Sequence, residues 1–145
     1  MTLRRLLHTH APASVILVRL VVGGVFLSEG IQKFLFPAEL GAGRFEKIGI
    51  PFPAVLAPFD GFFEVLCGFL VIIGLFTRCA TIPMIINMIV AISTTKIPIL
   101  LKSGFWTMAH EARVDYAMLL GSVFLLIVGA GWLSIDALIP AKKPT

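Results

Sequence analysis

Charged side chains are scarce in this sequence, at 14% of its residues against 58% hydrophobic ones. The mean hydropathy of +0.99 is too high for a soluble domain of this length and is typical of a small polytopic membrane protein. The formal net charge of +4 comes from scattered bases that mostly flank apolar runs. Such bases are topology signals, so we expect the lipid bilayer as a partner and no nucleic acid.

Cysteine is also rare, and the two present, Cys67 and Cys79, form no CxxC motif and no metal-binding spacing. Their apolar surroundings predict buried, inert thiols, which argues against a disulfide-exchange enzyme. His110 has no acid or cysteine ligand set at metal spacing beside it, so no metal site is predicted.

Four apolar runs are long enough to cross a bilayer, at about residues 14–36, 54–76, 80–101 and 116–133. About twenty residues at ~1.5 Å each span a ~30 Å hydrocarbon core. The first run resembles a signal peptide in following Arg4 and Arg5, but it is long, lacks an A-x-A-like site and contains Glu29 and Lys33. We therefore predict an all-α protein, a single antiparallel four-transmembrane-helix bundle over residues 1–145 with short tails.

Two shorter features accompany these runs. Residues 44–48 mix charged and apolar side chains and could form a short interfacial helix. In the first run, Gly24 and Ser28 form a small-xxx-small pair that would allow another helix to approach closely.

Charged residues inside the first two runs occur in pairs one helical turn apart. Glu29 precedes Lys33 by four residues, which is the favoured order for an ion pair within one helix. Asp60 and Glu64 have the same spacing but the same sign. Two carboxylates on one face repel when both are ionised, so either cations lie opposite them or one holds a proton.

The distribution of bases predicts the orientation. With four spans both termini lie on one side, together with Arg4, Arg5, Arg78, Lys142 and Lys143, whereas the bases on the other side are offset by acids. The positive-inside rule then predicts cytoplasmic termini. Arg19 and Arg78 are expected to snorkel to the inner interface.

This threading brings charges from several runs to the outward-facing end of the bundle. The inner half would hold only Arg19, Arg78 and Asn87. A side chain charged at bilayer depth costs at least ~2.5 kcal/mol on insertion scales, so such residues usually pair or face water. The candidate polar cluster, for a quinone or a proton, consists of Glu29, Lys33, Asp60, Glu64, Lys96, His110, Arg113 and Asp115.

Six short segments follow one another along the chain: Arg19 with Gly23-Gly24, Gly30-Ile31-Gln32-Lys33, Gly49-Ile50-Pro51, Glu64 with Gly68, Gly74-Leu75-Phe76-Thr77-Arg78 and His110-Glu111-Ala112-Arg113-Val114-Asp115-Tyr116. In this order and spacing they resemble the DoxX family of small bacterial four-helix membrane proteins, over about residues 17–136. The resemblance implies a subunit of the bacterial inner membrane associated with redox chemistry. Some relatives look like subunits of thiosulfate:quinone oxidoreductase, and others are linked to thiol or oxidative stress. The resemblance supplies no agreed catalytic residue.

The functional hypothesis is a membrane subunit of a redox system. The sequence has no rhodanese-like cysteine loop, haem ligand pair or GxGxxG motif, so an oxidoreductase mechanism would need a redox partner protein or a diffusible quinone. The alternative is a non-enzymatic scaffold or assembly protein in which the charges only fix the helices. A small-solute or proton transporter is a third reading, although four spans without an inverted repeat would have to form a homo-oligomer for alternating access.

Overall fold

The computed structural model describes residues 11–139, and this part of the chain contains helices and no strand, which confirms the all-α prediction. The long helices are α2 (Val15–Leu35), α4 (Pro53–Ile73), α5 (Thr77–Ala91) and α8 (Arg113–Val128). The shorter helices are α3 (Ala42–Lys47), the π-helix η1 (Ile92–Lys96), α6 (Ile97–Ser103), α7 (Phe105–Glu111) and α9 (Ile135–Leu138).

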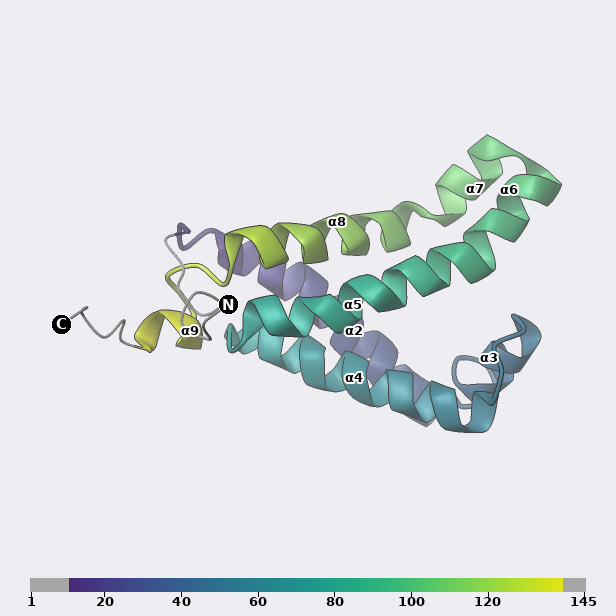
Figure 1. Ribbon diagram of the computed structural model, residues 1–145, viewed down its shortest axis with the longest axis horizontal. Helices are drawn as coiled ribbons and strands as arrows, with labels where there is room; N and C mark the ends of the chain where they lie inside the picture. The colour runs from purple at the N-terminus through teal and green to yellow at the C-terminus, as the bar shows by residue number, and fades with distance from the viewer. Residues whose placement is uncertain (1–10, 140–145) are drawn as a thin grey trace.

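The long helices form two antiparallel pairs (Figure 1). Helix α2 packs most extensively on α4, and α5 packs on α8, whereas α4 and α5 share a smaller contact. The pairs meet near α9, here called the α9 end, and diverge toward α3, α6 and α7, here called the α3 end (Figure 1). The backbones of the two pairs are therefore farther apart at the α3 end than at the α9 end (Figure 1).

Within residues 11–139, three helical segments are long and apolar enough to cross a membrane: Val15–Leu35, Pro53–Ile73 and Thr77–Ser103. The predicted fourth span corresponds to α8, which has 16 residues and ends at Val128, five residues before the predicted boundary. At ~1.5 Å per residue such a helix is shorter than a ~30 Å hydrocarbon core. The fourth crossing therefore stays a prediction.

The helix boundaries follow local chemistry. Helix α4 ends at Gly74, whose left-handed conformation (φ 70°) is accessible to glycine and allows the Leu75 N–H to bond the Leu70 carbonyl. The predicted short helix at residues 44–48 is present as α3, shifted to Ala42–Lys47. The third span is longer than predicted because α5, η1 and α6 run continuously from Thr77 to Ser103.

Glycine contacts bring α2 and α4 close together. A Cβ atom at Gly30 would lie 2.7 Å from the Gly61 carbonyl oxygen, and one at Gly68 would lie 2.7 Å from the Leu27 nitrogen. Gly24 has no atom within 4 Å of such a position. The prediction that Gly24 and Ser28 form the packing pair was thus wrong, because Gly23, one position earlier, is the residue on the contacting face.

We expect Gly68→Ala to lower the thermal unfolding midpoint in detergent clearly. The added methyl meets backbone atoms, which cannot rotate away, and overpacking of this kind costs about 1–3 kcal/mol. Gly24→Ala is the matched control. It adds the same methyl where nothing lies nearby, and alanine favours a helix over glycine, so its midpoint should stay equal or rise. Equal losses in both variants would contradict close packing of α2 on α4.

Arg19 is buried at the α9 end, only 2% exposed, and the prediction that it snorkels to the interface was wrong. Its guanidinium donates to the carbonyls of Val71 at 2.9 Å and Ile72 at 2.6 Å, in the last turn of α4. It also donates to the carbonyls of Ala130, at 3.0 Å, and Leu133. A single side chain from α2 thus binds the end of α4 and the segment after α8.

Asp136 complements Arg19 from the other side of this junction. Its carboxylate accepts hydrogen bonds from the backbone N–H groups of Phe76 (2.8 Å) and Thr77 (3.1 Å) at the start of α5. A negative charge at a helix N-terminus is favourable because unpaired N–H groups point toward it. Phe76 has a left-handed backbone (φ 49°) that is unusual for a bulky residue, and these bonds hold it. Arg78 is half-buried and donates to the Ile127 and Val128 carbonyls.

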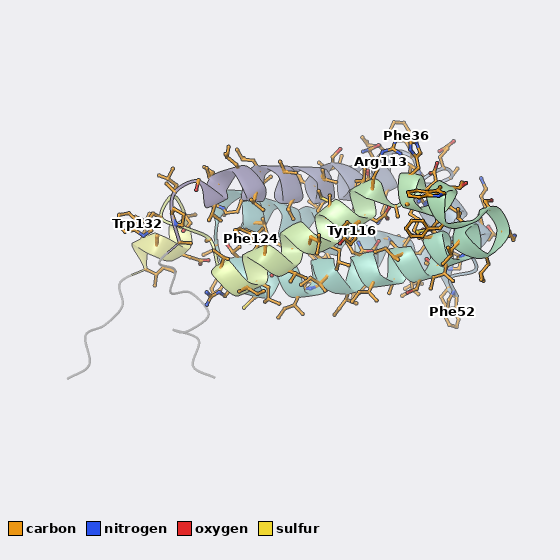
Figure 2. The ribbon with its side chains drawn as sticks, turned by 90° about the horizontal axis from the view of Figure 1, so that it is seen from above. Phe36, Phe52, Arg113, Tyr116, Phe124 and Trp132 are labelled. Carbon is orange, nitrogen blue, oxygen red and sulfur yellow. The ribbon has the colours of Figure 1, made fainter. Side chains whose placement is uncertain are left out.

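The outer surface of the bundle is apolar. Figure 2 labels large exposed side chains along the molecule, including Tyr116 and Phe124 of α8, with Trp132 at the α9 end and Phe36 and Phe52 at the other. Trp106 in α7 is 84% exposed. Large apolar side chains on the outside, with aromatic rings toward the ends, are typical of helices in contact with lipid.

Candidate functional site

The centre of the site is a group of charged side chains between α2 and α4, the charge triad of Lys33, Asp60 and Glu64. The Lys33 ammonium pairs with Asp60 and lies 2.6 Å from Glu64 Oε2. Asp60 and Glu64 face α2 together because they lie one turn apart on α4. The sequence-based alternative that cations lie opposite these carboxylates is the arrangement found.

Asn87 of α5 completes this group. Its amide donates to Glu64 Oε1 at 2.6 Å, and Glu64 is only 5% exposed. Asn87 was expected in the inner half, away from the cluster, and that expectation was wrong. The triad thereby links three long helices, α2, α4 and α5.

A second ion pair joins the π-helix η1, which continues α5, to helix α8. Lys96 Nζ lies 3.2 Å from Asp115 Oδ2, which connects η1 to α8. The π-helix that ends at Lys96 contains an extra residue per turn, a feature frequent at functional sites. The hydroxyls of Thr94 and Thr95 bond the carbonyls of Val90 and Ala91, so the widened turn keeps its backbone partners.

A cavity of about 760 Å³ lies between the two helix pairs toward the α3 end. The volume is in the range of small-molecule sites. Both ion-paired groups lie on its wall, and most of the remaining lining is apolar, including Phe59, Phe63 and Ile86. Its polar or charged lining is contributed by Glu29, Lys33, Arg44, Asp60, Glu64, Asn87, Thr94, Thr95, Lys96 and Asp115.

Glu29 is on the cavity wall but does not form the predicted ion pair with Lys33. Lys33 instead reaches across to α4, where two carboxylates lie near it. Within residues 11–139, Glu29 has no ion-pair partner, and its side chain is exposed. The local pairing inferred from the i,i+4 spacing was therefore wrong, because a neighbouring helix offers Lys33 a better partner.

His110 and Arg113 do not line the cavity, although both were predicted to belong to the cluster. Both side chains are exposed, and Arg113 donates to the His110 carbonyl at 2.5 Å. They lie at the junction of α7 and α8, where the chain turns outside the bundle. The structure thus brings together six of the eight predicted residues: Glu29, Lys33, Asp60, Glu64, Lys96 and Asp115.

Four polar lining residues were missing from the prediction, Arg44, Asn87, Thr94 and Thr95. The signal for Arg44 was its place in a short amphipathic segment between the first two spans, and α3 packs on α4 beside the cavity. For Asn87 the signal was a lone amide inside an apolar run, where a polar group needs a partner.

The arrangement can hold a polar group against charged side chains while apolar walls hold the rest of a molecule. Carboxylates can exchange protons, and ammonium groups can donate hydrogen bonds to carbonyl oxygens. In the part of the chain that the structure describes, no three His, Cys, Asp or Glu side chains are close enough to hold a metal ion. Cys67 is buried and Cys79 half-buried, and both thiols are free.

Comparisons with known proteins agree with this membrane architecture. A Mycobacterium tuberculosis protein described as an uncharacterized membrane protein is 54% identical over 138 residues, covering 91% of this chain and 85% of its own length. The Bacillus subtilis protein named "Putative oxidoreductase CatD" is 32% identical over 121 residues, covering 83% of each chain. No solved structure matches.

Two family models match overlapping parts of the chain. The model described as TQO small subunit DoxD matches residues 58–145. The model described as DoxX matches residues 14–97, which include α2, α4, α5 and the charge triad. The chain therefore belongs to the DoxX family of membrane proteins.

Proposed function

We propose that this protein is the membrane subunit of a bacterial redox system and that its cavity holds the head group of a quinone. The observation that carries this proposal is the combination, in one cavity of about 760 Å³, of ion-paired acids and lysines with apolar walls. The redox assignment is supported by the name of one relative, "Putative oxidoreductase CatD", and by the description of one matching family model, TQO small subunit DoxD.

The cavity residues suit an amphipathic molecule with carbonyl groups. Lys33 and Lys96 are donors on opposite helix pairs, and Phe59 and Phe63, with ring centroids 4.8 Å apart and planes inclined by 52°, offer an apolar aromatic wall. A quinone supplies the capacity to take up and release electrons together with protons.

The chain's own residues would bind the quinone head group and hold or deliver protons. The ammonium of Lys33 is placed to donate to a carbonyl oxygen, while Asp60 and Glu64 hold it in the wall of the cavity. Glu64 can hold a proton at its carboxylate and deliver it locally, because it lines the cavity and is otherwise enclosed. The walls of α4 and α5 exclude bulk water from this carboxylate.

The test begins with the analogue decylubiquinone. We expect it to bind saturably to the protein purified in mild detergent with its co-purifying partners. Glu64→Gln preserves the side-chain shape but removes the proton-carrying carboxylate. With thiosulfate added as the electron donor to the co-purifying partners, we expect this variant to lower the rate of quinone reduction by the complex about 100-fold, the size typical of a lost general acid or base. Both steps are measured on the same preparation, by ligand titration and by absorbance of the reduced quinone.

Glu39→Gln is the control because Glu39 is exposed and absent from the cavity wall. It should retain full activity. Absence of decylubiquinone binding, or full activity of Glu64→Gln, would contradict the proposal.

We also propose an inner-membrane location with both termini cytoplasmic, which places the cavity in the extracytoplasmic half. Arg78 near the α9 end and the bases in the tails support this orientation through the positive-inside rule. A C-terminal reporter active only outside the cytoplasm would overturn it.

A second candidate function is a non-enzymatic scaffold or assembly protein. It is favoured by one observation: the triad and the Lys96–Asp115 pair each link different helices, as a purely structural network would. In that case charge removal would change stability but no turnover, and the Lys33 variants described in the Discussion separate the two functions.

A further inference from the structure

The cavity wall carries more carboxylates than cations. Four acids line it, Glu29, Asp60, Glu64 and Asp115, against the three bases Lys33, Arg44 and Lys96. Because these groups lie around a cavity within apolar helices, their charges are screened less than on a protein surface. The cavity is therefore a site of negative potential when all of them are ionised.

The ion pairs show where the excess negative charge lies. Lys96 is paired with Asp115, whereas the single ammonium of Lys33 is shared between Asp60 and Glu64. Oε2 of Glu64 is buried, and its partner within the described residues is the Lys33 ammonium 2.6 Å away, which also pairs with Asp60. The Glu64 carboxylate, on a residue that is only 5% exposed, thus shares its single cation, Lys33, with Asp60.

Glu29 adds a second acid without a cation. It lines the cavity one turn before Lys33 on α2, and none of the ion pairs in residues 11–139 includes it. Glu29 and Arg44, the remaining base, are both exposed, but Glu29 belongs to the long helix α2, whereas Arg44 belongs to α3, which packs on α4 at the end of the bundle. The part of the cavity between the long helices therefore holds the excess negative charge.

Aromatic rings supply the other half of a cation site. Phe26, Phe45, Phe59 and Phe63 line the same cavity. The faces of aromatic rings attract cations, and one ring already does so, since Lys33 Nζ lies 5.7 Å from the centroid of Phe45.

We propose that the cavity also binds amphipathic organic monocations, molecules with an apolar aromatic body and one delocalised positive charge. The rings and aliphatic side chains contact the body, and the carboxylates of Glu29 and the triad compensate the charge. A delocalised cation is favoured over a compact ammonium because it is more weakly hydrated and loses less on leaving water. An anion of the same shape meets the same apolar walls but is repelled by the uncompensated carboxylates.

Two probes of almost identical shape and opposite charge test this inference: tetraphenylphosphonium and tetraphenylborate. Equilibrium dialysis of the full chain in detergent, corrected with protein-free micelles, gives the binding of each. We expect saturable binding of about one tetraphenylphosphonium per chain and no tetraphenylborate above the micelle blank. Glu29→Gln should weaken tetraphenylphosphonium binding about tenfold, as expected for unit charges roughly 10 Å apart at an effective dielectric constant of about 20.

Glu46→Gln is the matched control, since it removes the same charge from an exposed site on α3 outside the cavity wall. It should leave binding unchanged, and Glu29→Asp should retain it. Equal binding of both probes, no phosphonium binding, or equal losses in the Glu29→Gln and Glu46→Gln variants would overturn the inference. Decylubiquinone titration of the same preparation tests the proposed function separately, because a neutral quinone does not depend on the net charge of the cavity.

Discussion

Replacing Arg19 with alanine should leave little folded protein in detergent. Arg19 is 2% exposed and donates to four carbonyls, those of Val71, Ile72, Ala130 and Leu133. Hydrogen bonds to a charged group are worth about 1.5–3 kcal/mol each, and unsatisfied buried carbonyls add a further cost. We therefore expect a loss of at least about 3 kcal/mol, a large part of the stability of a typical domain. Fluorescence-detected size exclusion and thermal unfolding measure the loss.

Arg113→Ala is the matched control for this variant. It removes the same side chain from an exposed position, where the guanidinium makes a local hydrogen bond to the His110 carbonyl. Its unfolding midpoint should change little. Arg19→Lys should be intermediate, because an ammonium keeps the charge but lacks the planar fork that reaches several carbonyls at once. A stable, monodisperse Arg19→Ala protein would show that the junction at the α9 end is not required for folding.

Lys33→Met should be the most destabilising change within the cavity. It leaves Asp60 and Glu64, whose side chains are 21% and 6% exposed, facing each other without their shared cation. Removing one partner of a buried ion pair typically costs about 3–5 kcal/mol, because the remaining charge is uncompensated. We expect a loss in this range, measured by thermal unfolding of the purified protein.

A charge-neutral triad should recover much of that loss. In the triple variant Lys33→Met, Asp60→Asn, Glu64→Gln, no uncompensated charge remains, and replacement of buried ion pairs by neutral groups is often close to neutral in stability. Lys102→Met serves as the control, since Lys102 is exposed at the α3 end. If the triple variant is no more stable than Lys33→Met, the loss does not arise from the unpaired carboxylates.

The same triple variant separates the two candidate functions. A folded protein that no longer supports quinone reduction indicates that the triad acts in the redox step. A folded protein with unchanged turnover favours the scaffold.

Much of the helical layout could be predicted from composition. The first two spans begin and end within one to three residues of their predicted positions because hydropathy and the Pro37, Pro53 and Gly74 signals coincide there. The later boundaries were less accurate. The π-helix and Pro98 allow the third span to continue into α6, and α8 ends at Val128, just before Gly129 and before the apolar run ends.

The site was predicted only in part, for a physical reason. Antiparallel threading places charges at a common depth, and this sufficed to group six residues that share the cavity wall. Depth does not specify the direction in which a side chain points. His110 and Arg113 were therefore grouped with these residues but do not line the cavity, and Asn87 was placed in the wrong half although it bonds Glu64.

The sequence by itself determined that this is an all-α membrane protein whose polar residues gather toward one end, because both properties depend on composition and order along the chain. Only the tertiary structure decided which partners those residues choose. Lys33 pairs with two carboxylates on α4 and not with Glu29 on its own helix, because the glycine contacts bring α4 close to α2. Arg19 donates hydrogen bonds to the last turn of α4 and to the segment after α8 and does not extend to the membrane interface, because both of these segments pack beside it at the α9 end.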